Sequence, residues 1–266
     1  MGHDTHGKTH LARHLARCAV WTAALVLALP YPPVAFLVMA GLFFSTFALF
    51  HDAAHGALGL PPVVNDLLLA VTSVPLFMSN HGQRQHHLRH HARPLEPDDL
   101  EGQGALTSLW RAAFEAPAAS VHMRVVAFSA VNDRVRPWVA LENVLNAATA
   151  VVVVRWGSAG LQAAFCMAVL LQFTMNAWAS HVPHRAPRWL LELASLFAWT
   201  GSPVVLSLVY HLEHHAHPRV PCAELRPNLD VQSPLLEANK ARTAPLPWTQ
   251  LQPELRPRPR RLRGMA

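Results

Sequence analysis

Residues 81–91 read His-Gly-Gln-Arg-Gln-His-His-Leu-Arg-His-His, so five of eleven consecutive positions are histidine. Residues three or four apart share a helix face, which places His87, His90 and His91 on roughly one face of a single turn. Two further clusters have helical spacing: His51 with His55, and His211 with His214 and His215. Long apolar segments separate the first cluster from the chain start and the second cluster from the third. The pattern predicts a polynuclear metal site assembled by helices.

The composition indicates an integral membrane protein. Of the 266 residues, 52% are hydrophobic and only 14% are charged, well below the roughly 25% charged residues of an average soluble domain. The net charge of +6 comes from residues gathered mostly at the two ends of the chain. Such charges next to membrane spans favour a cytoplasmic location, and they do not form the aromatic-interleaved groove typical of nucleic-acid binding. The three cysteines are far apart and odd in number, which argues against a disulfide framework.

We predict an all-α integral membrane fold with about four transmembrane helices in two hairpins. The four apolar runs are residues 18–29, 34–50, 139–154 and 161–179. Prolines 30, 32 and 33 form the first turn, and Arg155-Trp156-Gly157 forms the second. Interfacial or re-entrant helices are expected at residues 63–78, 106–128 and 189–210, which are apolar but interrupted or amphipathic. An even number of spans puts both termini and every histidine cluster on one side, which we expect to be cytoplasmic.

Three regions follow from this organisation. Residues 1–17 form a polar, basic head, and its histidines at positions 3, 6, 10 and 14 are expected on a solvated segment without a metal role. Residues 18–223 form the membrane catalytic domain. Residues 224–266 form a Pro/Arg-rich tail, expected to be extended and cytoplasmic.

The number of imidazoles favours two ions. Adjacent histidines such as His90 and His91 point about 100° apart around a helix, so they are better placed to serve two ions than one. The three clusters together supply eight imidazoles, which are too many for a single ion. Imidazole binds zinc, copper, iron and nickel alike, so the ligand type alone leaves the metal open.

The clusters resemble the three histidine boxes of the membrane fatty-acid desaturase superfamily, which also includes β-carotene hydroxylases and ketolases. The matching segments are His51-Asp52-Ala53-Ala54-His55, His87-Leu88-Arg89-His90-His91 and His211-Leu212-Glu213-His214-His215. The resemblance runs from about His51 to Leu225, and the three boxes together are specific. Asp52 of the first box resembles the carotenoid-modifying branch, as do three shorter segments: Asn65-Asp66, Pro97-Asp98-Asp99 and Pro183-His184-Arg185.

The resemblance implies a non-haem di-iron centre ligated almost wholly by histidine, at the cytosolic ends of four spanning helices. The implied ligands are His51, His55, His87, His90, His91, His184, His211, His214 and His215. His86 is an alternative to His87, and His181 is an alternative to His184 as the ligand that follows the fourth span. Asp52 would hold the other ring nitrogen of a ligand and fix its tautomer.

The expected activity is O2-dependent desaturation or hydroxylation of a long apolar chain. Unactivated C–H bonds offer nothing for acid–base or nucleophilic attack, whereas iron and O2 can supply a sufficient oxidant. We expect a fatty-acyl lipid substrate that enters from the bilayer, with a carotenoid as the alternative. We identify no haem, flavin or iron–sulfur motif in the sequence. Electrons are therefore expected from a separate donor of the ferredoxin or cytochrome b5 type.

Two other classes compete with this reading. His51-x-x-x-His55 suggests an intramembrane zinc hydrolase, but Asp52 stands where its general-base glutamate belongs, and the other boxes would have no role. A haem- or metal-carrying protein would use paired histidines on spanning helices, and His-His doublets at helix ends bind haem poorly.

Overall fold

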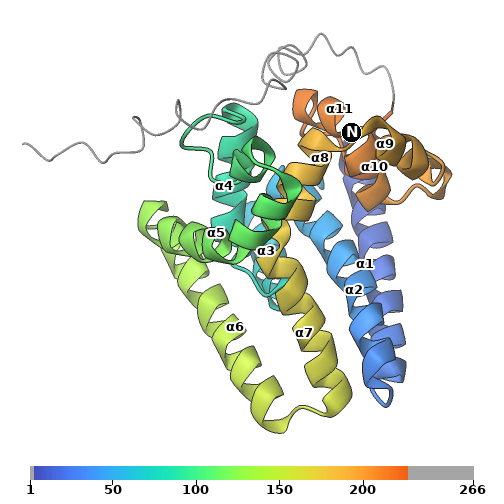
Figure 1. Cartoon of the computed structure of the whole chain (residues 1–266), viewed down its shortest axis with the longest axis vertical. Helices are drawn as coiled ribbons and strands as arrows, with labels where there is room; N and C mark the ends of the chain where they lie inside the picture. The colour runs from blue at the N-terminus through green and yellow to red at the C-terminus, as the bar shows by residue number, and fades with distance from the viewer. Residues whose placement is uncertain (1–2, 227–266) are drawn as a thin grey trace, which may run out of the picture. The chain divides into compact units, whose positions relative to one another are not determined.

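The computed structural model describes residues 3–226, which contain helices and no strand (Figure 1). The longer helices are α1 (His3–Ala28), α2 (Pro32–Ala54), α3 (Pro62–Leu76), α4 (Asn80–Ala92), α5 (Leu109–Ala130), α6 (Arg136–Trp156) and α7 (Ala159–Phe173). The shorter ones are η1 (Gly102–Leu106), η2 (Asn176–His181), α8 (Val182–Arg185), α9 (Arg188–Ser195), η3 (Ala198–Thr200), α10 (Pro203–Val209), α11 (His211–Ala216) and η4 (Cys222–Glu224). The all-α prediction is confirmed for these residues.

Helix α2 is the centre of the packing. Two prolines in its first turn suit the start of a helix, where their missing N–H groups cost no hydrogen bond. The helix packs against α1, α3 and α7. Gly41 allows the close approach of α1, because a Cβ there would lie 2.5 Å from the Trp21 ring. Small residues serve the same purpose where membrane helices cross.

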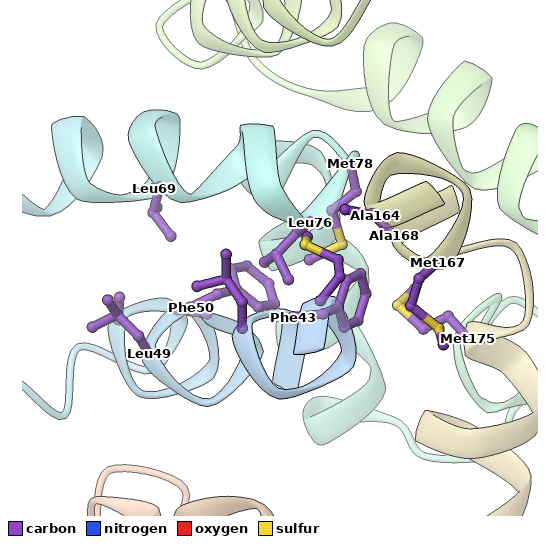
Figure 2. Packing of buried hydrophobic residues seen from close by; sticks show 14 of the residues in the cluster. Phe43, Leu49, Phe50, Leu69, Leu76, Met78, Ala164, Met167, Ala168 and Met175 are labelled. Carbon is purple, nitrogen blue, oxygen red and sulfur yellow. The ribbon is translucent and has the colours of Figure 1, made fainter. Parts of the chain in front are cut away.

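The buried apolar cluster lies between α2, α3 and α7 (Figure 2). Phe43 and Phe50 come from α2, Leu76 comes from α3, and Met167 comes from α7. This contact holds α2 in place below its last turn, which carries the first histidine cluster. The core therefore fixes the position of the histidines at the C-terminal end of α2.

Three helices in residues 3–226 are long and apolar enough to cross a membrane: Gly7–Ala28 within α1, then α2 and α6. Two bent pairs also qualify, which allows up to five spans. One of them joins α7 to the segment Asn176–Arg185 with a bend of 49°. The helices α1 and α2 form one hairpin, and α6 and α7 form another (Figure 1). The count of four spans and their orientation in the membrane stay predictions.

The segment expected to be interfacial or re-entrant is strongly bent in the structure. Helices α3 and α4 meet at 101°, at a break between Leu76 and Asn80. Phe77 adopts a left-handed conformation with φ 49°, which ends α3. Ser79 then caps α4 by accepting a hydrogen bond from the Gly82 N–H. Because of this bend, α4 turns its histidines toward the end of α2.

The other two segments expected at the interface expose large apolar side chains. Residues 106–128 correspond mainly to α5, where Trp110 is 83% exposed and Phe114 is 88% exposed. Residues 189–210 form α9, η3 and α10, where Trp199 is 84% exposed. Such surfaces favour contact with lipid. Whether these segments lie in the interface stays a prediction.

The expected solvation of the N-terminal histidines is wrong for His10 and His14, although most other described side chains of residues 7–17 are exposed. Residues 3–17 form the first part of α1, continuous with its apolar second part. His10 and His14 lie on one side of this helix and are 3% and 2% exposed, because the side that carries them packs against the rest of the chain. The predicted tail lies outside the described residues except for residues 224–226.

Candidate metal centre

The nine histidines expected as ligands lie in two groups. The first group consists of His51, His55, His87, His91 and His214. The second group consists of His90, His184, His211 and His215. In each group, every residue offers one ligand atom, and these atoms lie within 4.8 Å of one another. Four helices that are distant in the sequence supply them: the end of α2, then α4, α8 and α11.

Helical geometry divides the second box between the two groups. His87 and His91 are four residues apart on α4 and belong to the first group. His90 belongs to the second group. Adjacent positions on a helix diverge by about 100°, so His90 and His91 reach different centres, as the sequence suggested.

The third box is divided in the opposite way. His214 joins the first group, whereas His211 and His215, four residues apart on α11, join the second group. Helices α4 and α11 thus each contribute to both centres. Helix α4 supplies two imidazoles to the first group and one to the second, whereas α11 supplies one to the first group and two to the second.

The spacing of the ring nitrogens fits bound cations. In the first group, His55 Nε2 is 2.8 Å from His87 Nε2, and His91 Nε2 is 3.0 Å from His214 Nε2. In the second group, His184 Nε2 is 3.1 Å from both His90 Nε2 and His211 Nε2. Imidazole nitrogens bind a first-row ion such as zinc at about 2.0–2.1 Å, so two ligands at right angles would stand roughly 3 Å apart. The converging nitrogens match that spacing in both groups.

The imidazoles are suited to ligation in their neutral form. Burial lowers the pKa of His211, His214 and His215 well below its usual value. Neighbouring imidazoles lower it further because two positive rings repel each other. A neutral ring keeps the lone pair that a metal requires.

A carboxylate orients His87 of the first group. Its Nδ1 donates to Glu101 Oε1 at 2.7 Å, which leaves Nε2 directed at the group. Gln83 Nε2 donates to the other oxygen of Glu101 at 3.0 Å. Burial acts to raise the pKa of Glu101, but the nearby imidazoles of His87 and His90 outweigh it and lower the pKa to about 2. Glu101 is therefore an ionised acceptor.

Asp99 performs the same task for His90 of the second group. His90 Nδ1 donates to Asp99 Oδ2 at 2.7 Å. The carboxylate also accepts from the Leu95 N–H at 2.8 Å and the Gly102 N–H at 2.9 Å. A Cβ at position 102 would collide with this carboxylate, so only glycine allows the loop to approach so closely. Such partners of a ligand's second nitrogen fix its tautomer and orientation.

Comparison with protein families agrees with this geometry. Residues 27–245 match the sequence model named "Fatty acid desaturase". The chain belongs to the fatty acid desaturase family. Searches of curated proteins and of solved structures gave no match. The matched residues include all nine histidines of the two groups. Membership of this family indicates an oxidoreductase of the desaturase or hydroxylase type.

In this desaturase-family chain, Asp52 does not hydrogen-bond to a histidine of either group. Its Oδ1 lies 3.8 Å from His51 Nδ1, which is too long for a hydrogen bond. Asp52 instead accepts from His14 Nε2 at 3.0 Å and from the Cys222 N–H at 3.1 Å. The atom close to His51 Nδ1 is the sulfur of Cys222, at 3.2 Å. The resemblance implied that Asp52 holds the second ring nitrogen of a ligand, and for His51 the structure places the Cys222 thiol at that nitrogen.

The thiol of Cys222 is buried and neutral. Burial raises its pKa well above the ordinary value, and the Asp52 carboxylate raises it further. A neutral thiol is a weak acceptor for a ring N–H. His51 is thus supported less strongly than His87, which has an ionised carboxylate as its partner.

Helix α1 contributes two contacts that the sequence did not predict. His14 donates to Asp52, and His10 Nε2 lies 2.6 Å from Glu224 Oε1. These contacts join the start of the described chain to the first box and to the segment after the third box. The helical spacing of the N-terminal histidines was the available signal, because it indicated a common helix face.

The remaining histidines have other partners. His86 Nε2 lies 2.9 Å from the Met123 carbonyl oxygen, away from both groups. His181 Nδ1 lies 3.1 Å from the Gly104 carbonyl oxygen. Of the two ambiguous pairs, the structure therefore places His87 and His184 in the groups. His81 contacts Glu142 and belongs to neither group.

Proposed function

We propose that this protein is an O2-dependent oxidoreductase that desaturates or hydroxylates a long apolar chain, with a fatty-acyl lipid as the expected substrate. The supporting observation is the pair of adjacent all-histidine groups in a chain of the fatty acid desaturase family. Two groups of five and four imidazoles suit two non-haem irons, with the nine histidines as the proposed ligands.

Two bound irons would supply the oxidising power that unactivated C–H bonds require, with O2 as the oxidant. The protein's part is to hold and orient. Glu101 and Asp99 fix the rings of His87 and His90, one for each group. Helices α4 and α11 contribute to both groups, which keeps the two centres in a fixed relation.

The surroundings support an apolar substrate from the membrane. Helices α1, α2 and α6 are long and apolar enough to span a bilayer, and the histidine groups lie at the end of α2. We propose that this end and both termini face the cytoplasm, because the positive charges gather at the two ends of the chain. A separate ferredoxin or cytochrome b5 type of protein would deliver the electrons.

A carotenoid is the second candidate substrate. Two residues of the segments that resemble the carotenoid-modifying branch have direct roles in the structure. Asp99 supports His90, and His184 belongs to the second group. This placement ties the branch-like segments to the metal centre.

Two measurements test the proposal. Metal analysis of the purified protein should give two irons per chain, with no Soret band in the optical spectrum. One zinc per chain would contradict it, as would a haem spectrum. Expression in a host that makes both β-carotene and saturated lipids, followed by lipid and pigment profiling, should show new double bonds or hydroxyl groups in the acyl chains. Oxidised carotenoids with unchanged lipids would favour the second candidate.

A further inference from the structure

A cavity of about 570 Å³ is lined by residues of α4 that do not belong to the metal centre. It is bounded by the start of α3, by α4 and by the segment that leads into α6. Its polar and aromatic lining includes Asn65, Asp66, His81, Arg84, Arg134 and Trp138. The residues that α4 contributes are spaced at intervals of three and four from position 81, so they form one helix face. None of the metal-centre histidines lines the cavity, so the cavity is a separate feature.

His81 is held rigidly at this cavity. It is 3% exposed, and its Nδ1 donates to Glu142 Oε1 at 2.7 Å. Glu142 is 0% exposed and also accepts from the Ser79 hydroxyl at 2.7 Å. The imidazole stacks on Trp138, with 5.1 Å between the ring centroids and 12° between the planes. Both the position and the tilt of the ring are therefore fixed.

The other ring nitrogen of His81 is unsatisfied. Among the described residues, Nε2 has no hydrogen-bond partner, although the Asp66 carboxylate stands 3.5 Å away. Buried polar atoms in native proteins nearly always have partners. An oriented, buried nitrogen at the wall of a cavity, with no hydrogen bond and only a carboxylate at 3.5 Å, points to a ligand.

The charges on the lining select the kind of ligand. Two guanidinium groups, Arg84 and Arg134, face a single lining carboxylate, that of Asp66. Arg84 is anchored through its Nε, which donates to the Ala54 carbonyl oxygen at 3.0 Å. Arginine forks bind phosphate and carboxylate oxygens in pairs. A metal ion is a poor alternative, because within residues 3–226 no third His, Cys or acidic ligand joins His81 and Asp66 in a metal-binding group.

We propose that this cavity binds a phosphate group, with Arg84 and Arg134 pairing its oxygens and His81 Nε2 completing the contact. The phosphate can come from the head group of a phospholipid or from a soluble phosphate ester. This site does not depend on the proposed desaturase or hydroxylase activity, because none of its residues belongs to the metal centre.

Binding to the purified full-length protein in a maltoside detergent tests the proposal. The probes are short-chain phosphatidylglycerol, inorganic phosphate and short-chain diacylglycerol, which lacks the phosphate. Arg134→Gln should weaken phosphate binding about tenfold, as expected for the loss of a charge-assisted hydrogen bond. Asp66→Asn should strengthen it severalfold, because the repelling carboxylate is removed. Arg134 is exposed, so its replacement should leave the fold intact.

Arg89→Gln is the matched control. This arginine is also on α4, but it is exposed, pairs with Asp98 and lies outside the cavity. It should bind the probes like the wild type, and iron content should be the same in all variants. Binding of phosphatidylglycerol alone identifies a lipid head group as the source, and equal binding of inorganic phosphate identifies a soluble ligand. The proposal is overturned if diacylglycerol binds as tightly as phosphatidylglycerol, if Arg134→Gln changes nothing, or if no phosphate probe binds.

Discussion

The first histidine group is enclosed by the helices that carry it, whereas the second group lies nearer the surface of the described residues. The first group has five imidazoles, and four of them are buried. The second has four, of which His184 and His211 are partly exposed. Similar histidine spacing in the sequence therefore produces two unequal centres. We expect the first group to hold a bound ion more firmly and the second to leave more room for ligands from outside the chain.

The supporting contacts differ as well. His90 of the second group depends on Asp99, whose side chain is 0% exposed and which also accepts two backbone N–H groups. The first group divides its support between the ionised Glu101 and the neutral thiol of Cys222. The second group thus has a strong hydrogen-bond partner in Asp99, whereas the first group is held in place more by its burial.

Loss of one ligand should have the largest effect. His90→Ala and His214→Ala each remove a nitrogen from one group, and each should lower product formation by at least about a hundredfold, more than the loss of an outer partner. The protein should still insert in the membrane. Product profiling together with the amount of membrane-bound protein checks this result. Retained turnover in either variant would refute its assignment as a ligand.

The adjacent pair His86 and His87 gives a sharper test of the first group. His87→Ala should lose iron and activity, because its Nε2 lies among the nitrogens of that group. His86→Ala should keep most of both, since this ring contacts the Met123 carbonyl oxygen. Iron per chain and turnover, measured side by side, distinguish the two. The opposite ranking would mean that α4 has a different register.

Removal of the carboxylate partners should have an intermediate effect. Asp99→Asn should reduce the iron affinity of the second group about 10–100-fold, the usual range for such partners. Glu101→Gln should cost the first group less, about tenfold, because the Glu101 side chain is 11% exposed and burial keeps the group together. Iron retained after dialysis against a chelator measures the difference. Equal losses would remove the distinction between the two groups.

Changes at Cys222 and His14 should be the mildest. Cys222→Ala should weaken iron retention by less than about tenfold, and Cys222→Ser should recover part of it by keeping an acceptor near His51.

His14→Leu should lower the free energy of unfolding by about 1–3 kcal/mol, since Asp52 then loses a buried hydrogen bond. His14→Gln, which keeps a donor, serves as its control. Thermal unfolding in detergent measures the stability of the His14 variants. Equal stability of His14→Leu and His14→Gln would argue against the hydrogen bond between His14 and Asp52.

The metal centre could be largely anticipated from local spacing. The assignment of His90 and His91 to different groups follows from helix geometry alone, and so does the pairing of His211 with His215. The distinction between His86 and His87 needed the structure, because it depends on where Ser79 starts α4 and on how α4 packs against α5. The sequence pattern permits either register.

Contacts between distant segments were not predictable in the same way. His14 and Asp52 are 38 residues apart, and Cys222 and His51 are 171 apart. No local pattern links such residues. The basic character of residues 1–17 argued for solvated histidines, but His10 and His14 are buried with Glu224 and Asp52 as their partners.

The contact between His10 and Glu224 joins residues 214 positions apart, and it has a consequence for the timing of assembly. A ribosome completes the N-terminal part of α1 long before it reaches α11, at roughly 5–20 residues per second. Until α11 and η4 emerge, the first group lacks His214 and the second lacks His211 and His215. Both histidine groups are therefore completed late in biosynthesis. Stalled nascent chains that end before residue 211 should bind little iron, and stable iron binding by such chains would contradict this order.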